Sequence, residues 1–195
     1  MNLNPRMILT GVLLGGCVVL GGLLTGCGLP AIEPARADTM RYYVLSGTTG
    51  LQFEANGVHV RPVRVPAYLQ SRFLAVRLAE NEVRYASDAQ WAEPLDAALT
   101  QWLRANIKGQ ASGGDVTVQV LMQQCEGVIG PGAGLRFVAT FEINTGAKDS
   151  APARHVFTAS PRAWDGKDYA QLAAGLRAAA GELAEAISAA LPPKK

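Results

Sequence analysis

The chain has 195 residues, and its 18 basic and 16 acidic side chains leave a net charge of +2. So small a charge excludes a nucleic-acid-binding domain that relies on phosphate contacts, and with 49% hydrophobic residues it also excludes a disordered chain. Three cysteines cannot form a dense disulfide scaffold, and two histidines cannot supply a three-histidine metal site. We therefore expect one globular domain with appendages, without a metal or cofactor.

Residues 1–26 carry the parts of an export signal. Arg6 is their only charged residue, and an uncharged run extends over Met7–Leu24. The tetrapeptide Leu-Thr-Gly-Cys that ends at Cys27 resembles the lipobox of bacterial lipoproteins. This resemblance implies that residues 1–26 are removed as a signal peptide and that Cys27 becomes a lipidated N-terminus, which several acyl chains hold firmly in a membrane.

Two other interpretations of this segment stay open. The first is a retained transmembrane helix, because the uncharged run is close to the minimum length for a span, although its glycines weaken a helix. The second is cleavage before Cys17, which would leave only Met7–Leu14 as an apolar core. In lipoproteins resembling those of enteric bacteria, a residue other than Asp after the lipidated cysteine, here Gly28, implies export to the outer membrane.

Residues 27–40 form the lipidated N-terminus and a tether. Pro30 and Pro34 interrupt a mixed composition that has neither helical nor strand periodicity. Fully extended, the tether would span at most about 40 Å. After the changes at Cys17 and Cys27, Cys125 is left as one free thiol, expected to be a small buried hydrophobe on a strand, with an intermolecular disulfide as the alternative.

The folded domain is predicted over residues 41–191, with 192–195 as a tail. It opens with strands at 41–45 and 58–66, and Pro62 makes the second strand edge-like or bulged because proline has no N–H to donate. Alternation at 74–78 and 83–85, separated by a polar turn, predicts a hairpin.

A helix follows this hairpin. Pro94 suits its first turn, Gly109 its end, and Trp91 is expected to pack in the core over the helix start. Its apolar positions are Leu95, Ala98, Leu99, Trp102, Leu103 and Ile107. They lie at helical spacing on one face.

The second half of the domain reads as strands and then a helix. Alternating apolar residues predict strands at 116–123, 137–143 and 155–159, and alanine-rich periodicity predicts a helix over 167–191. The glycine-rich segment 127–134 lies between two strands and lacks the lysine of a phosphate-binding loop, so we interpret it as a hairpin connection. Its exposed Val128 and Ile129 could touch a partner or lipid.

Several motifs stand in a distinctive order after the lipobox: Tyr42–Leu45, Val60–Leu69, Trp91–Leu95 and a helix start at Gly166–Tyr169. This order resembles the ABC-type transport auxiliary lipoproteins of the PqiC type, over nearly the whole mature chain. The candidate partner-binding or packing residues within these motifs are Tyr42, Tyr43, Pro62, Pro66, Tyr68, Leu69, Trp91, Pro94 and Leu95.

The resemblance implies an α/β fold, a mixed β-sheet flanked by helices, similar to the N-terminal domain of TolB. It also implies an outer-membrane lipoprotein on the periplasmic side, which works with an MCE-domain protein and inner-membrane components to move phospholipids or other hydrophobic molecules and so supports membrane integrity. Such proteins are not enzymes. This chain departs from the pattern in segment 127–134 and at Gly175 and Gly181, which leaves the partner surface and any homo-oligomer contact open.

The residues themselves agree on the absence of catalysis. No serine stands in a G-x-S-x-G elbow, and Glu93 and Asp96 are placed to favour a helix dipole rather than acid–base chemistry. Arginines that could form a basic strip, or simply a solvated strand face, are Arg61, Arg64, Arg72 and Arg77. The alternative function is an envelope-assembly or regulatory lipoprotein that acts as a protein-interaction module.

Overall fold

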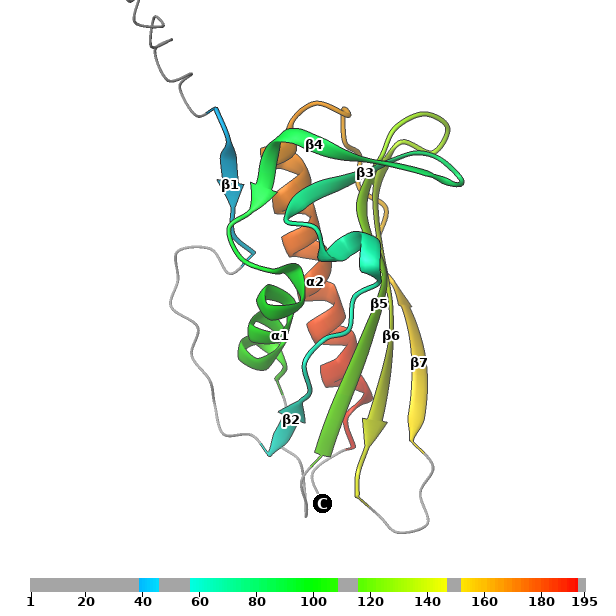
Figure 1. Ribbon diagram of the computed structural model, residues 1–195. Coiled ribbons are helices and arrows are strands. Elements are labelled where there is room, and N and C mark those ends of the chain that lie inside the picture. Colours follow the sequence, from blue (N-terminus) through cyan, green and yellow to red (C-terminus); the bar gives the residue numbers. More distant parts are fainter. Residues whose placement is uncertain (1–38, 46–56, 109–115, 147–151, 193–195) are drawn as a thin grey trace, which may run out of the picture. The chain divides into compact units, whose positions relative to one another are not determined.

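The computed structural model describes residues 39–45, 57–108, 116–146 and 152–192. Within them the chain forms a seven-stranded mixed sheet and two α-helices, which confirms the predicted α/β class (Figure 1). The strands are β1 (Arg41–Tyr43), β2 (Val58–Val60), β3 (Phe73–Ala79), β4 (Glu82–Trp91), β5 (Val116–Val128), β6 (Gly134–Asn144) and β7 (Ala153–Thr158). The helices are α1 (Leu95–Asn106) and α2 (Tyr169–Ala190), with a 3-10 helix η1 (Ala67–Gln70). The predicted signal peptide, Cys27 and the tether up to residue 38 lie outside the described residues.

The strands follow the order β1-β4-β3-β5-β6-β7, and β2 also pairs with β5. Antiparallel hairpins join β3 to β4 and β5 to β6, whereas β1 pairs with β4, and β3 with β5, in parallel. The hairpin predicted at 74–85 is confirmed, but β4 extends to Trp91. A regular strand buries every second residue, but the buried residues Ala86 and Ala89 are three positions apart, and the pairing of β3 with β4 is irregular. The alternation in the sequence therefore did not reveal this extension.

The strand predicted at 58–66 is interrupted as Pro62 requires. Only Val58–Val60 forms a regular ladder, although Arg61 N–H still donates to Val118 O at 2.9 Å. The chain returns to β5 at Arg64, whose N–H donates to Val120 O at 3.0 Å.

The helix boundaries follow from their caps. Pro94 is the N-cap of α1 rather than a first-turn residue, one position earlier than predicted. The side chain of Asp168 accepts hydrogen bonds from the N–H groups of Ala170 and Gln171, so α2 begins at Tyr169 rather than at 167. Helix α2 ends at Ala190 because the next residue, Leu191, precedes a proline and is extended.

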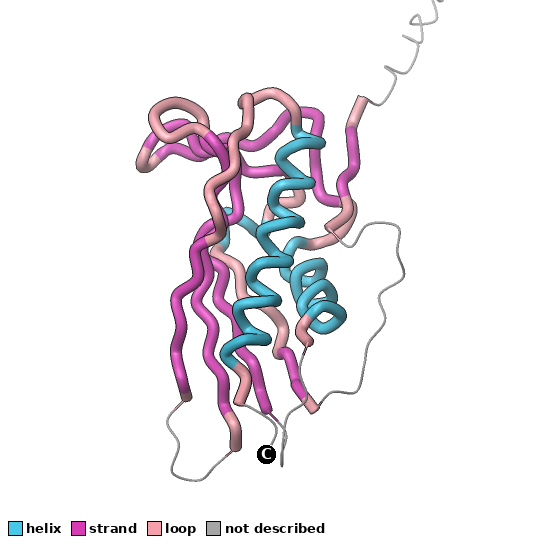
Figure 2. Tube along the Cα trace, turned by 180° about the vertical axis from the view of Figure 1, so that it is seen from behind, coloured by secondary structure: helices cyan, strands magenta, loops and turns pink. Residues whose placement is uncertain are grey.

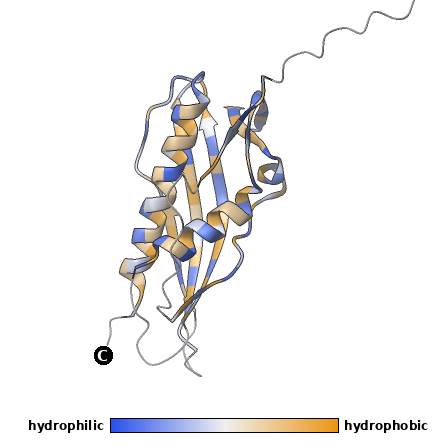
Figure 3. Cartoon of the chain, turned by 90° about the vertical axis from the view of Figure 1, so that its left-hand side faces the viewer, coloured by the Kyte–Doolittle hydropathy of each residue, from blue (hydrophilic) through white to orange (hydrophobic). Residues whose placement is uncertain are grey.

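Both helices cover the same face of the sheet. The buried residues of β5 and β6 are mainly those of one alternation, including Val118, Val120 and Phe141, and they form one core with the leucines of α1 and α2. Figure 2 shows α2 in front of the strands, and Figure 3 shows hydrophobic residues along both helices and the strands beside them. Cys125 lies in this core, 2% exposed, as the buried interpretation predicted.

The opposite face of β5–β7 carries no helix in the described part of the chain. Leu121 and Val156 on this open face are 41% and 74% exposed, with Thr140 of β6 between them in the register. The helices therefore flank only one face of these three strands in the described part of the chain.

The glycine-rich connection is shorter than predicted. Gly127 and Val128 continue β5, and Gly134 begins β6, so the connection comprises residues 129–133. Val128 is consequently buried, 4% exposed, and the expectation that it is exposed is wrong. Gly127 is needed inside the strand, because a Cβ there would overlap the indole ring of Trp164.

Candidate functional site

Two of the sequence motifs meet at the edge of the sheet. In the parallel pairing of β1 with β4, Tyr43 lies opposite Trp91, and Ala92 N–H donates to Tyr43 O at 2.8 Å. Trp91 is buried in the core, as predicted, and Tyr43 packs against the core. Tyr42 instead points outward and is 57% exposed.

The remaining motif residues divide between the core and the surface. Leu69 and Leu95 are buried, Pro66 is half-buried, and Pro62 and Pro94 are exposed. None of the nine motif residues lines the cavity of about 520 Å³ that is described below. Packing accounts for the buried ones, and a partner role for the exposed ones stays a prediction.

The 3-10 helix η1 links β4 to β5 through hydrogen bonds of Tyr68. Pro66 is its N-cap, and the Tyr68 hydroxyl donates to Gln123 O of β5 at 3.2 Å. The Tyr85 hydroxyl of β4 donates to Tyr68 O at 2.9 Å. Tyr68 is thereby positioned beside Glu126, whose charge acts on the Tyr68 hydroxyl.

A buried ion pair connects β3 and β5. The Nε–H of Arg77 donates to the Glu126 carboxylate, whose side chain has no exposed surface. Hydrogen bonding to Glu126 raises the pKa of Arg77, and burial followed by the Glu126 charge raises the pKa of Tyr68. The second carboxylate oxygen, Oε2, has no hydrogen-bond partner among the described residues. Arg77 therefore does not belong to an exposed basic strip, in contrast to Arg61, Arg64 and Arg72, which are exposed.

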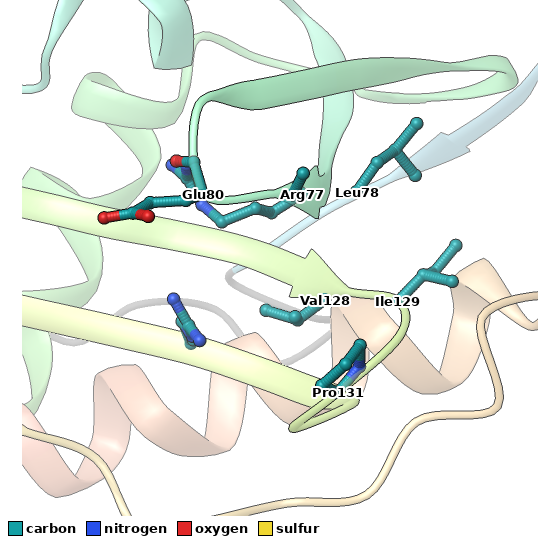
Figure 4. A pocket seen from close by; sticks show the side chains of 8 residues that line it. Arg77, Leu78, Glu80, Val128, Ile129 and Pro131 are labelled. Atoms are coloured by element: carbon teal, nitrogen blue, oxygen red, sulfur yellow. The ribbon is translucent and has the colours of Figure 1, made fainter.

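A cavity of about 520 Å³ opens where the β3–β4 and β5–β6 hairpins diverge. Near its base, Ile129 N–H donates to Arg77 O at 3.0 Å, which links the two hairpins. The cavity is lined by Arg77, Leu78, Ala79, Glu80, Val128, Ile129, Pro131 and Arg136. Figure 4 shows Leu78 and Ile129 on opposite sides of it, with the Glu80 carboxylate at the end away from both.

Charged groups surround one part of this cavity. Arg136 lies directly opposite Glu126 in the β5–β6 register, yet it is exposed and no described acidic side chain forms an ion pair with it. Arg77 Nη1 donates to Glu80 O at 2.7 Å, which fixes the β3–β4 turn at the rim. Such a combination of apolar walls and few charges is typical of a binding cavity.

The sequence pattern points to this site only in part, through Val128 and Ile129, for which it left contact with a partner or lipid open. A further signal is Glu126, a carboxylate set within the apolar run of β5, where an unpaired charge would be costly. Finding Arg77 as its partner requires the parallel pairing of β3 with β5, which periodicity does not reveal.

A smaller, more polar hollow lies on the open face. Its volume is about 150 Å³, and it is lined by Arg64, Gln119, Leu121, Thr140, Glu142 and Arg154. Arg154 and Glu142 form an exposed ion pair across it, 3.4 Å apart.

Two other kinds of feature were not found among the described residues. No cluster of their side chains could hold a metal ion, and neither α-helix has the apolar length that a membrane span requires.

Comparison with known proteins decides the family. The family model for the ABC-type transport auxiliary lipoprotein component matches residues 43–188. The chain belongs to this family. The match includes every strand and both helices of the auxiliary lipoprotein domain apart from the first residues of β1 and the end of α2.

Solved structures share the fold of this auxiliary lipoprotein. The crystal structure of an uncharacterized protein is 19% identical, with a TM-score of 0.60 over 75% of this chain and 95% of the other. Protein XCC0632 from Xanthomonas campestris, of family DUF330, is also 19% identical, with a TM-score of 0.56 over 67% of this chain and 80% of the other. No curated protein matches the chain.

Proposed function

We propose that this auxiliary lipoprotein is a lipid-anchored, periplasmic accessory subunit of an MCE/ABC-type system. In this role it would help to move phospholipids or other hydrophobic molecules between the inner and outer membranes and thereby support membrane integrity. The observation that carries the proposal is the family match over residues 43–188, because an auxiliary component implies a transporter partner. The tetrapeptide ending at Cys27 supports a lipid anchor, and Gly28 after it supports anchoring in the outer membrane.

We further propose that the protein binds rather than catalyses. The walls of the 520 Å³ cavity are apolar residues and arginines with a single carboxylate, Glu80. Acid–base or nucleophilic catalysis needs an activated nucleophile or a tuned base in such a cavity, and this lining supplies neither. The exposed motif residues Tyr42, Pro62 and Pro94 are candidates for contact with the partner.

Affinity purification of the full chain from membranes, after mild solubilisation, tests the proposal. We expect an MCE-domain protein and inner-membrane transport components to co-purify. If Tyr42 contacts the partner, Tyr42→Ala should weaken this association. The matched control is Ser87→Ala, a change at an exposed residue of β4 outside the motifs, which should leave the association unchanged. Recovery of cell-wall assembly enzymes instead, with no transport component, would favour the envelope-assembly or regulatory role.

A further inference from the structure

The cavity between the hairpin tips is lined by apolar and by charged side chains. Its apolar wall is formed by Leu78, Ala79, Val128, Ile129 and Pro131. The charged groups on it are Arg77, Glu80 and Arg136. Figure 4 shows the Glu80 carboxylate at the end of the cavity away from Leu78 and Ile129.

The charges at this cavity are balanced but not all paired. Arg77 is neutralised by the buried carboxylate of Glu126. The remaining two charged side chains are Arg136 and Glu80, one of each sign, both exposed and in no ion pair with a described residue. A ligand that complements them needs a negative group for Arg136 and a positive group for Glu80.

We propose that this cavity binds an acyl chain of a zwitterionic phospholipid whose headgroup carries a phosphate and an ammonium. The acyl chain lies between Leu78 and Ile129, the phosphate on Arg136 and the ammonium on Glu80. The volume of about 520 Å³ lies within the range of small-molecule sites. This inference rests on the proposed function in that it names a lipid class for the same transport role.

The surrounding structure keeps such a site open in advance. The Arg77 guanidinium holds the Glu80 carbonyl at one rim, and the Arg77 carbonyl accepts from Ile129 N–H at the base. Both bonds belong to a residue whose side chain is anchored by Glu126. A cavity that exists before the ligand arrives avoids part of the cost of ordering its walls.

Photo-crosslinking of the full chain in nanodiscs tests the proposal. Three probes carry the same diazirine acyl chain: a zwitterionic phosphatidylethanolamine, an anionic phosphatidylglycerol and an uncharged diacylglycerol. We expect the phosphatidylethanolamine probe to label peptides that contain residues 78–79 and 128–131 most strongly, and the diacylglycerol probe least. Equal labelling by all three probes, or labelling confined to other segments, would overturn the proposal.

Two matched pairs of variants sharpen the result. Ala79→Phe fills the cavity, while Ala153→Phe places the same ring at another exposed strand end, and only the first should abolish labelling. Arg136→Gln should reduce phosphatidylethanolamine labelling about twofold to fivefold, the range for an exposed charge pair, whereas Arg84→Gln should leave it unchanged.

Glu80→Gln tests the zwitterion specifically. Because it removes the partner of the ammonium, it should shift the labelling ratio toward phosphatidylglycerol. An unchanged ratio would refute the assignment of Glu80, and unchanged labelling of Ala79→Phe, with a wild-type melting temperature, would refute the cavity itself. Labelling that fails while the MCE-domain partner still co-purifies would overturn this inference alone. Intact labelling without that partner would count against the proposed function alone.

Discussion

Arg77 and Glu126 form an ion pair in which the Glu126 side chain is fully buried while the Arg77 side chain is 14% exposed. The pair joins two strands that are parallel neighbours and supports the base of the cavity. Burying a charge is unfavourable unless a partner compensates it, so the two residues depend on each other.

Replacing Arg77 alone should therefore destabilise the domain strongly. We expect Arg77→Met to lower the free energy of unfolding by about 3 kcal/mol, because it leaves the Glu126 carboxylate buried without its partner. Joint replacement with Glu126→Leu should recover most of that loss. Urea denaturation followed by tryptophan fluorescence measures both, and an equal loss in the single and double variants would contradict the interpretation.

The two glycines of α2 should respond to alanine to different extents. Gly181 has no atom within 4 Å of the position of an added Cβ, so Gly181→Ala should raise the free energy of unfolding by about 0.5–1 kcal/mol through helix propensity. At Gly175 a Cβ would overlap the end of the Leu135 side chain of β6, which must shift, so Gly175→Ala should gain less stability than Gly181→Ala. Thermal denaturation of the pair checks this, and equal stabilisation at both positions would show that the approach of α2 to β6 is looser than described.

The buried thiol of Cys125 should make stability depend on pH. Burial, and then the charge of Glu126, raise the pKa of this thiol. A raised pKa in the folded state stabilises the protein below the unfolded value of about 8.5, and this contribution is lost as the pH rises above it. We expect a loss of up to about 1.4 kcal/mol per pH unit from this group above that value.

Cys125→Ala is the control for this dependence. Above that pH, the free energy of unfolding of this variant should fall less steeply with pH than that of the native protein. At neutral pH the variant should still be folded. In the native protein the thiol should also resist iodoacetamide until the chain unfolds. Rapid alkylation of the native protein, or a disulfide-linked dimer, would favour the intermolecular alternative instead.

Two cysteine variants decide between the interpretations of the N-terminal segment. We expect Cys27→Ala to release the protein from the membrane fraction while the domain stays folded, and Cys17→Ala to have no effect. Fractionation and acyl-group mass spectrometry measure the outcome. The reverse pattern would support cleavage before Cys17, and membrane association of both single variants would support a retained transmembrane helix.

Periodicity predicted the elements that bury one regular face. The helix positions from Leu95 to Ile107 and the alternation of β5 and β6 followed directly from spacing, since a long apolar repeat leaves few alternatives. The prediction was weakest where small residues make the contacts. Ala86 and Ala89 hid the end of β4, and Gly127 and Gly134 resembled a loop although they form strand ends.

The candidate cavity could not be predicted because it depends on pairing between distant strands. Arg77 and Glu126 are 49 positions apart, with β4 and α1 between their strands. Only the parallel register of β3 with β5 brings them together. The sequence motifs, in contrast, identified residues that hold the fold, such as Trp91 opposite Tyr43.

The shortness of β1 has a mechanical consequence. If Cys27 carries the anchor, any pull between membrane and domain enters at Arg41, and β1 pairs with β4 over only three residues, aided by the Arg41–Asp88 ion pair at 2.8 Å. Peeling this strand would release about 10 Å of slack. The load would then meet Leu45, which has no exposed surface and is held by the core. Under such a load, β1 would therefore detach from β4 before the core of the domain opens.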